Sequence, residues 1–164
     1  MKNLNFDSIY NILEKSFEPF LHRGYENQKI LLENDRYNLI TYSENNEILG
    51  FLTYWKIEEN ILFVEHFAVD ERARGKGIGS KIFNDFLKLE GHKILEVEPP
   101  HTEIDKKRIK FYESFDFIFD EREYYQPPYK KGDNKTRLNI MSSKKLDENE
   151  FNTIIGKIYK YVYN

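Results

Sequence analysis

The stretch FAVDERARGKGIGSKIF, Phe67–Phe83, places a β-rich segment directly before a glycine-rich turn and an amphipathic helix. The helical period runs through Ile78, Ile82 and Phe83. Between the two lies RGKGIGS, Arg74–Ser80. Glycines let a backbone approach a ligand closely, and the unpaired amides at a helix N-terminus favour an anion such as a pyrophosphate. The stretch predicts a strand–turn–helix unit with an anion site, and a glycine-rich turn with solvated basic residues is the alternative.

Two common phosphate-binding loops do not fit this turn. A Walker loop needs Gly-Lys-Ser/Thr, whereas Gly79-Ser80-Lys81 reverses that order. The dinucleotide fingerprint GxGxxG is not matched either, because the glycines here are spaced Gly75-x-Gly77-x-Gly79. Positive charge around the turn comes from Arg72, Arg74 and Lys76.

The periodicity outside this unit predicts alternating groups of helices and strands. Helices are predicted over Asp7–Phe17 with Asp7 as a cap, Tyr25–Glu33, Ile78–Leu89, from Thr102 to about Phe115, and from Asp147 onward. Strands are predicted over Tyr37–Ser43, Ile48–Ile57, Ile61–Val69, Ile94–Glu98, Phe117–Tyr125 and Arg137–Met141. Asp105 after Thr102 and Glu150 after Asp147 have the spacing of capping boxes. The short polar breaks ENNE and EEN indicate an antiparallel meander, and the whole pattern is mixed α/β.

Length and composition bound the remaining possibilities. A chain of 164 residues predicts one domain over residues 1–164, with residues 146–164 as a C-terminal helical extension. The net charge of -3 opposes general nucleic-acid binding. The chain has no Cys, which excludes disulfides, thiolate metal sites and cysteine nucleophiles. Its four histidines show no ligand spacing, so no metal is expected.

The sequence shows no sign of a membrane or export segment. Charged and polar side chains interrupt the first twenty residues. The longest nearly apolar run, Ile48–Trp55, is far shorter than the roughly 20 residues that a membrane helix needs. We therefore expect a soluble, cytoplasmic protein.

Two motifs together resemble the GNAT superfamily of N-acetyltransferases. The turn has Arg74, Gly77 and Gly79 at the positions of that family's Arg/Gln-x-x-Gly-x-Gly/Ala loop, and FYESFDF, Phe111–Phe117, resembles its second signature, FYxxxGF. The resemblance covers about Asn3–Ser142 and departs from the family pattern at three places. Asp116 stands where the family usually has Gly, and the positions often held by Asn and Ala are here Asp105 and Arg108.

The resemblance implies a mixed, mostly antiparallel central sheet flanked by helices, with acetyl-CoA as cosubstrate. It implies that the strand before the loop presents backbone amides to the acetyl carbonyl and pantetheine. The cofactor-binding residues implied in this way are Phe67, Ala68, Val69, Arg74, Gly75, Lys76, Gly77, Ile78, Gly79 and Ser80.

Two side chains are candidates for catalysis. By resemblance, Tyr112 is the general acid that protonates the departing thiolate, although it also has the spacing of a packing residue. Glu65 lies two residues before Phe67 and so on the same face of the strand, where a carboxylate could remove a proton from the substrate ammonium. Whether Glu65 or a water chain is the base stays open. Glu96 and Glu98 share one face of the next predicted strand and rank below Glu65 for this role.

The function expected is transfer of an acetyl group from acetyl-CoA to a primary amine by direct attack in a ternary complex. An acyl-CoA-binding regulatory module without turnover is the alternative. The acceptor is not identified by the sequence, and a homodimer is left open. The apolar side chains of the last helix that could serve an interface are Ile154, Ile155, Ile158, Tyr159 and Val162.

Overall fold

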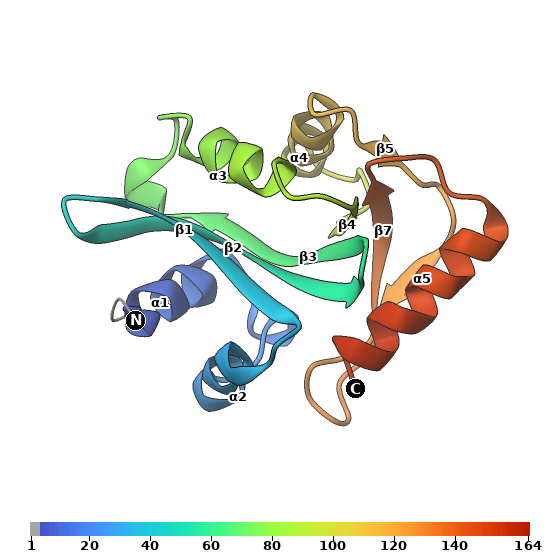
Figure 1. Ribbon diagram of the computed structural model, residues 1–164, viewed down its shortest axis with the longest axis horizontal. Helices are drawn as coiled ribbons and strands as arrows, with labels where there is room; N and C mark the ends of the chain where they lie inside the picture. The colour runs from blue at the N-terminus through green and yellow to red at the C-terminus, as the bar shows by residue number, and fades with distance from the viewer. Residues whose placement is uncertain (1–3) are drawn as a thin grey trace. The chain divides into compact units, whose positions relative to one another are not determined.

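The computed structural model describes residues 4–164 and contains, within them, a seven-stranded sheet flanked by helices (Figure 1). The strand order is β1-β2-β3-β4-β7-β5, and β6 also pairs with β7. This confirms the predicted mixed, mostly antiparallel fold. The chain divides into two compact units, the first reaching Trp55 and resuming over Glu65–Glu90, the second comprising Lys56–Val64 and Gly91–Asn164. The prediction that the chain acts as one domain stays a prediction.

The first unit is built around an antiparallel hairpin. Its elements are α1 (Phe6–Ser16), α2 (Tyr25–Lys29), β1 (Tyr37–Glu44), β2 (Glu47–Glu58, entering the second unit after Trp55), the end of β3 (Ile61–Val69) and α3 (Ile78–Leu87). Asn45 and Asn46 form the turn between β1 and β2 with φ of 50° and 63°. Asparagine tolerates this left-handed backbone, and a two-residue turn of this kind matches the twist of a hairpin.

Helices cover both faces of this hairpin. In Figure 1, α1 and α2 lie on one side of β1 and β2, and α3 lies on the other. The core on the α1 side consists of Ile9, Ile12, Leu13, Phe51 and Ala68. Helix α1 is capped by Asn5, whose side chain accepts a hydrogen bond from the Ser8 amide, and not by Asp7 as predicted. Asp7 instead lies in the first turn, where a negative charge complements the helix dipole.

The second unit pairs strands in both directions. Its further elements are β4 (His92–Val97), α4 (Glu103–Glu113), β5 (Ile118–Phe119), β6 (Tyr124–Gln126), β7 (Thr136–Ser142) and α5 (Glu148–Tyr161). The segment Ile61–Val64 of β3 pairs in parallel with His92–Leu95 of β4. Strands β4, β5 and β6 each pair antiparallel with β7.

The predicted strand over Phe117–Tyr125 is wrong in its middle. It is split into β5 and β6, because the Asp120 side chain accepts hydrogen bonds from both the backbone amide and the guanidinium of Arg122, at 3.0 and 3.1 Å. An aspartate that binds the amide two residues ahead bends the chain and interrupts a strand. Periodicity alone did not reveal this turn.

Both predicted capping boxes are confirmed, at Thr102–Asp105 before α4 and at Asp147–Glu150 before α5. Helix α5 lies against β6, where the Tyr159 hydroxyl donates to the Tyr125 carbonyl at 2.5 Å. Its apolar face is buried within the chain, with Ile154 at 3% exposure and Ile158 at 0%. Ile154, Ile158 and Val162 are therefore not available for an interface, whereas Ile155 is half-buried and Tyr159 is 37% exposed, so the homodimer stays a prediction. No helix within residues 4–164 has the length and apolar character that crossing a bilayer requires.

Asp116 ends the α4 segment in the left-handed conformation that the sequence predicts, with φ of 65°. It is exposed, so its Cβ there brings strain without compensating burial. We expect Asp116→Gly to leave the free energy of unfolding unchanged or raise it by about 0.5–1 kcal/mol. Urea unfolding of both proteins measures this. A clear loss of stability would contradict the expectation and point to a contact of the carboxylate.

Candidate active site

A short 3₁₀ turn, Glu71–Ala73, connects the end of β3 to the glycine-rich turn, which leads into α3. Gly75 and Gly77 both have positive φ, 79° and 73°, which other residues adopt only with strain. A Cβ atom added to either glycine would meet nothing within 4 Å. The turn is therefore open on the side where side chains would otherwise project, and its backbone is accessible to a ligand.

The start of α3 offers its amides without a side-chain cap. Gly77 is the N-cap residue and has no side chain to accept a hydrogen bond, whereas Asn5, Thr102 and Asp147 cap α1, α4 and α5. The first turn of α3 also carries no acidic residue. The amides at this position and the positive end of the helix dipole favour a bound anion. The predicted residues thus fit a pyrophosphate group.

The end of β3 and the start of α3 lie in contact. A Cβ added at Gly79 would lie 3.7 Å from the ring of Phe67 and 3.7 Å from a methyl group of Val69. The structure therefore brings the two parts of the predicted cofactor-binding set together. Ile78 is buried at 2% exposure, so it offers this set only its backbone, while Arg74 and Lys76 are exposed.

The backbone amides of β3 point to alternate edges of the strand. The amides of His66 and Asp70 donate to β2 partners, Thr53 Oγ1 at 3.0 Å and Leu49 O at 2.8 Å. Because successive amides alternate, that of Ala68 faces β2 as well, and those of Phe67 and Val69 face the opposite edge. Both lie beyond Val64, where the pairing of β3 with β4 ends. Of the three predicted strand amides, Phe67 and Val69 have the orientation needed to reach a ligand at that edge.

Glu65 is a buried ion-pair partner. Its side chain is 0% exposed and accepts hydrogen bonds from Arg23 Nη1 at 2.7 Å and from Trp55 Nε1 at 3.0 Å. Burial alone would raise the pKa of Glu65, but the Arg23 charge and the hydrogen bonds from Trp55 and Arg23 together hold it below its ordinary value. Each carboxylate oxygen accepts a hydrogen bond and the group is a weak base, so this geometry weighs against the predicted general-base role.

Replacing Glu65 by Gln tests the ion pair. The variant leaves the Arg23 charge largely buried, and we expect the free energy of unfolding at neutral pH to fall by about 2 kcal/mol. Because folding lowers the pKa of Glu65, this contribution is present above the ordinary value of 4.5 and is lost as the pH falls through the lower folded value. The difference between wild type and variant should therefore shrink below about pH 4.5. Urea unfolding at several pH values measures it, and a difference that is independent of pH would contradict the assignment.

His66 is a packed histidine, as its position on the opposite face of the strand indicates. Its Nε2 lies 2.8 Å from the Leu21 carbonyl oxygen, which makes this nitrogen the donor. Burial lowers the pKa of His66, so the ring is neutral near pH 7.

Tyr112 lies in α4 with 7% of its surface exposed, and its ring packs edge-on against Phe111. Burial raises the pKa of the hydroxyl to about 12, with Arg108 opposing the shift. The sequence alone suggested an ordinary value near 10. The higher pKa means that Tyr112 holds its proton at any pH at which the protein would be assayed, which is the form a general acid needs.

Three residues of the site region have roles that the sequence did not indicate. Arg23 and Trp55 are the partners of Glu65, and they precede it by 42 and 10 positions, so no local pattern could reveal them. Arg72 was expected to add positive charge around the turn. Its guanidinium is instead paired with Asp70 and Glu47.

Comparison with known proteins agrees with this geometry. The model of the acetyltransferase (GNAT) family matches residues 6–117, more than half of the chain. A solved protein from Bacteroides thetaiotaomicron assigned to the GNAT family shares 31% identity at a TM-score of 0.88, covering 96% of this chain and 91% of that one. This chain belongs to the GNAT acetyltransferase family.

Other GNAT structures share the fold at lower identity. The ribosomal-protein-alanine N-acetyltransferase of Brucella melitensis is 19% identical, with a TM-score of 0.64 and coverage of 87% of this chain and 94% of that chain. An aminoglycoside 6'-N-acetyltransferase solved with coenzyme A is 13% identical, with a TM-score of 0.63 and coverage of 89% and 96%. No match to this chain was found among curated proteins.

Both motifs of this GNAT protein lie within the stretch that the family match covers. The glycine turn and the FYESFDF segment fall inside residues 6–117, and α5 lies beyond them. Within residues 4–164, no cluster of three or more His, Asp or Glu side chains has the arrangement of a metal site.

Proposed function

We propose that this GNAT protein is an N-acetyltransferase that moves the acetyl group of acetyl-CoA to a primary amine by direct attack in a ternary complex. The observation that carries the proposal is the uncapped start of α3 behind two open glycines, in a chain that the GNAT family model matches. The coenzyme A bound in the aminoglycoside acetyltransferase structure supports the same choice of cosubstrate.

The residues proposed to hold acetyl-CoA are those of the strand–turn–helix unit. The amides at the start of α3 and the backbone of Gly75 and Gly77 receive the pyrophosphate, with Arg74 and Lys76 adding positive charge. Acetyl-CoA supplies an activated acyl group, a thioester, to this site. The amides of Phe67 and Val69 are oriented to bind the acetyl carbonyl and to stabilise negative charge on its oxygen as the amine attacks.

Two proton transfers accompany the reaction. The thiolate gains a proton as it leaves, and we assign this donation to the Tyr112 hydroxyl, which is protonated at neutral pH. The amine loses a proton before or during attack. The Arg23 and Trp55 contacts of Glu65 favour a structural role for this carboxylate, so we assign proton removal to solvent. If Glu65 were the base, Glu65→Gln would lose activity mainly at low and neutral pH.

An amine panel with thiol release from acetyl-CoA as the readout tests the proposal. The acceptors of the two solved relatives differ, one an aminoglycoside and the other a ribosomal-protein alanine, so the panel should include aminoglycosides, peptides with N-terminal alanine, polyamines and lysine. Amine-dependent thiol release, with mass spectrometry showing the acetylated product, is the expected result. Tight CoA binding with no turnover on any amine would favour the regulatory module instead.

A further inference from the structure

Three charged side chains tie the glycine turn to the β1–β2 hairpin. The Arg72 guanidinium donates two hydrogen bonds to the Asp70 carboxylate, from Nε to Oδ1 and from Nη2 to Oδ2, both at 3.0 Å. The same Nη2 reaches Glu47, the first residue of β2, at 2.6 Å. We call these three residues the clamp.

Asp70, one of the three clamp residues, is itself held in place by backbone hydrogen bonds. The Asp70 amide donates to the Leu49 carbonyl on β2 at 2.8 Å, and the Asp70 carboxylate also caps the Arg72 amide at 3.0 Å. The hydrogen bonds from Arg72 hold the pKa of Asp70 at about 2, so its carboxylate is ionised at any ordinary pH. The start of the turn is therefore held to β2 by two contacts, one through the Asp70 backbone and one through Glu47.

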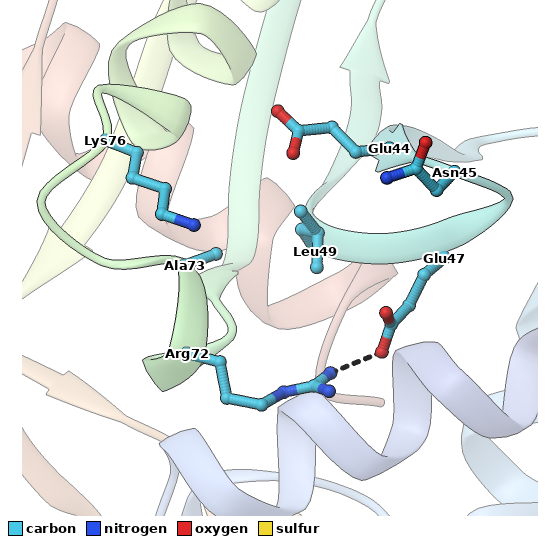
Figure 2. Close-up of a pocket in the computed structure, with 7 residues that line it drawn as sticks. All are labelled: Glu44, Asn45, Glu47, Leu49, Arg72, Ala73 and Lys76. Atoms are coloured by element: carbon cyan, nitrogen blue, oxygen red, sulfur yellow. Dashed lines mark hydrogen bonds and ion pairs between the residues drawn. The ribbon is translucent and has the colours of Figure 1, made fainter.

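Elsewhere the turn and the hairpin are separated by a cavity of about 230 Å³ (Figure 2). Beside the two outer clamp residues, Glu47 and Arg72, it is lined by Glu44, Asn45, Leu49, Ala73 and Lys76. Figure 2 shows the Arg72–Glu47 ion pair at one side of this space and Lys76 extending from the turn into it. The ion pair thus bridges a gap that the turn would otherwise be free to enter.

Such a bridge matters because the turn is rich in glycine. Gly75 and Gly77 have access to many backbone conformations, and a turn that must be ordered on binding loses affinity for its ligand. Resting on the proposed function, we propose that Glu47 and Arg72 are positioning residues that hold the glycine turn in the shape that receives the CoA pyrophosphate.

The direction in which CoA affinity changes when Glu47 loses its charge separates this proposal from a simple electrostatic attraction between the protein and CoA. CoA is an anion, so removing the negative charge of Glu47 should strengthen its binding if only long-range electrostatics acts. If Glu47 positions the turn, removing its charge should weaken binding. Arg72→Gln is less informative, because both explanations predict weaker binding.

The experiment titrates CoA calorimetrically into wild type, Glu47→Gln, Arg72→Gln and the double variant. We expect each single variant to weaken CoA binding by about 3- to 5-fold, with Arg72→Gln the larger because it also removes the hydrogen bonds to Asp70. The double variant should lose no more than Arg72→Gln alone, because that change already breaks the ion pair with Glu47. Asp85→Asn is the matched control. It breaks the Asp85–Lys88 ion pair of α3, whose side chains are 55% and 77% exposed, against 53% and 63% for Glu47 and Arg72. It should bind CoA no more weakly than wild type.

Hydrogen exchange of residues 74–80 in the ligand-free proteins gives the second readout. If the clamp orders the turn, the amides of residues 74–80 should exchange faster in Glu47→Gln than in wild type and at the wild-type rate in Asp85→Asn. The melting temperatures of both variants should stay close to that of wild type. The proposal needs both weaker binding and faster exchange in Glu47→Gln, and the absence of either overturns it. If wild type itself fails to bind CoA, the proposed function fails, and the exchange rates alone decide whether the clamp orders the turn.

Discussion

Gly77→Asp is expected to weaken CoA binding by about 100-fold or more, because it places a carboxylate at the helix start where the pyrophosphate is proposed to bind. Gly77 is the N-cap of α3 with φ of 73°, and a Cβ there meets nothing within 4 Å, so the new side chain is not excluded by its neighbours. Two like charges only a few ångströms apart repel strongly, and the carboxylate would also accept hydrogen bonds from the amides that the phosphates need. Calorimetric titration with CoA measures the loss.

Gly77→Asn is the matched control for this variant. Asparagine has the shape of aspartate and imposes a similar backbone strain in the left-handed region, but carries no charge. The difference in CoA affinity between the two variants therefore isolates the repulsion from the strain and from the competing hydrogen bonds. Equal affinities for Gly77→Asp and Gly77→Asn would remove the pyrophosphate from this position.

Tyr112→Phe is expected to lower turnover by roughly 10²-fold while leaving CoA affinity unchanged, because the variant keeps the ring and loses the proton of a general acid. The loss should shrink with an acyl donor whose thiol is a better leaving group, since such a thiolate needs less help from an acid. Steady-state rates with an acceptor found in the panel measure both effects. Because the pKa of Tyr112 is about 12, wild-type activity should not decline through ionisation of this residue below about pH 11.

Tyr54→Phe controls for the general effect of removing a buried hydroxyl. Tyr54 is exposed to the same extent as Tyr112, 7%, and its pKa is also raised by burial, but it lies in β2 and packs against Phe86, and it has no assigned role in the reaction. This control should retain turnover. Near-wild-type turnover in Tyr112→Phe as well would leave water as the proton donor.

Features that depend on neighbours in sequence were predictable. The caps at Thr102 and Asp147 need only a partner three residues away, and both form as expected. The left-handed backbone of Asp116 follows from a helix that ends within a known motif. The positive φ angles of the glycine turn belong to the same class, because Gly75 and Gly77 themselves permit them. Local patterns therefore predicted these features, whereas the resemblance to the GNAT family implied the cofactor-binding residues.

Features that depend on distant partners were not predictable. Strand alternation placed Glu65 and Phe67 on one face. Alternation cannot predict that Arg23, which lies 42 residues earlier in the chain, pairs with the Glu65 carboxylate. The same limit applies to Arg72, whose partner Glu47 lies 25 positions before it. In both cases a charged residue near a motif was expected to act on a bound ligand. In both cases the folded chain instead pairs that residue with an opposite charge that is distant in sequence.

The Trp55–Glu65 hydrogen bond has a practical use. Trp55 is the only tryptophan of the chain and is 2% exposed. Its indole therefore acts as a built-in fluorophore whose emission wavelength reports the environment of this carboxylate. Opening of the region around Arg23, β2 and the end of β3 would shift the emission to the red as water reaches the ring. Circular dichroism follows the helices of the whole chain. A difference between the two unfolding curves would show that this region opens before the rest, and coincident curves would show a single cooperative transition.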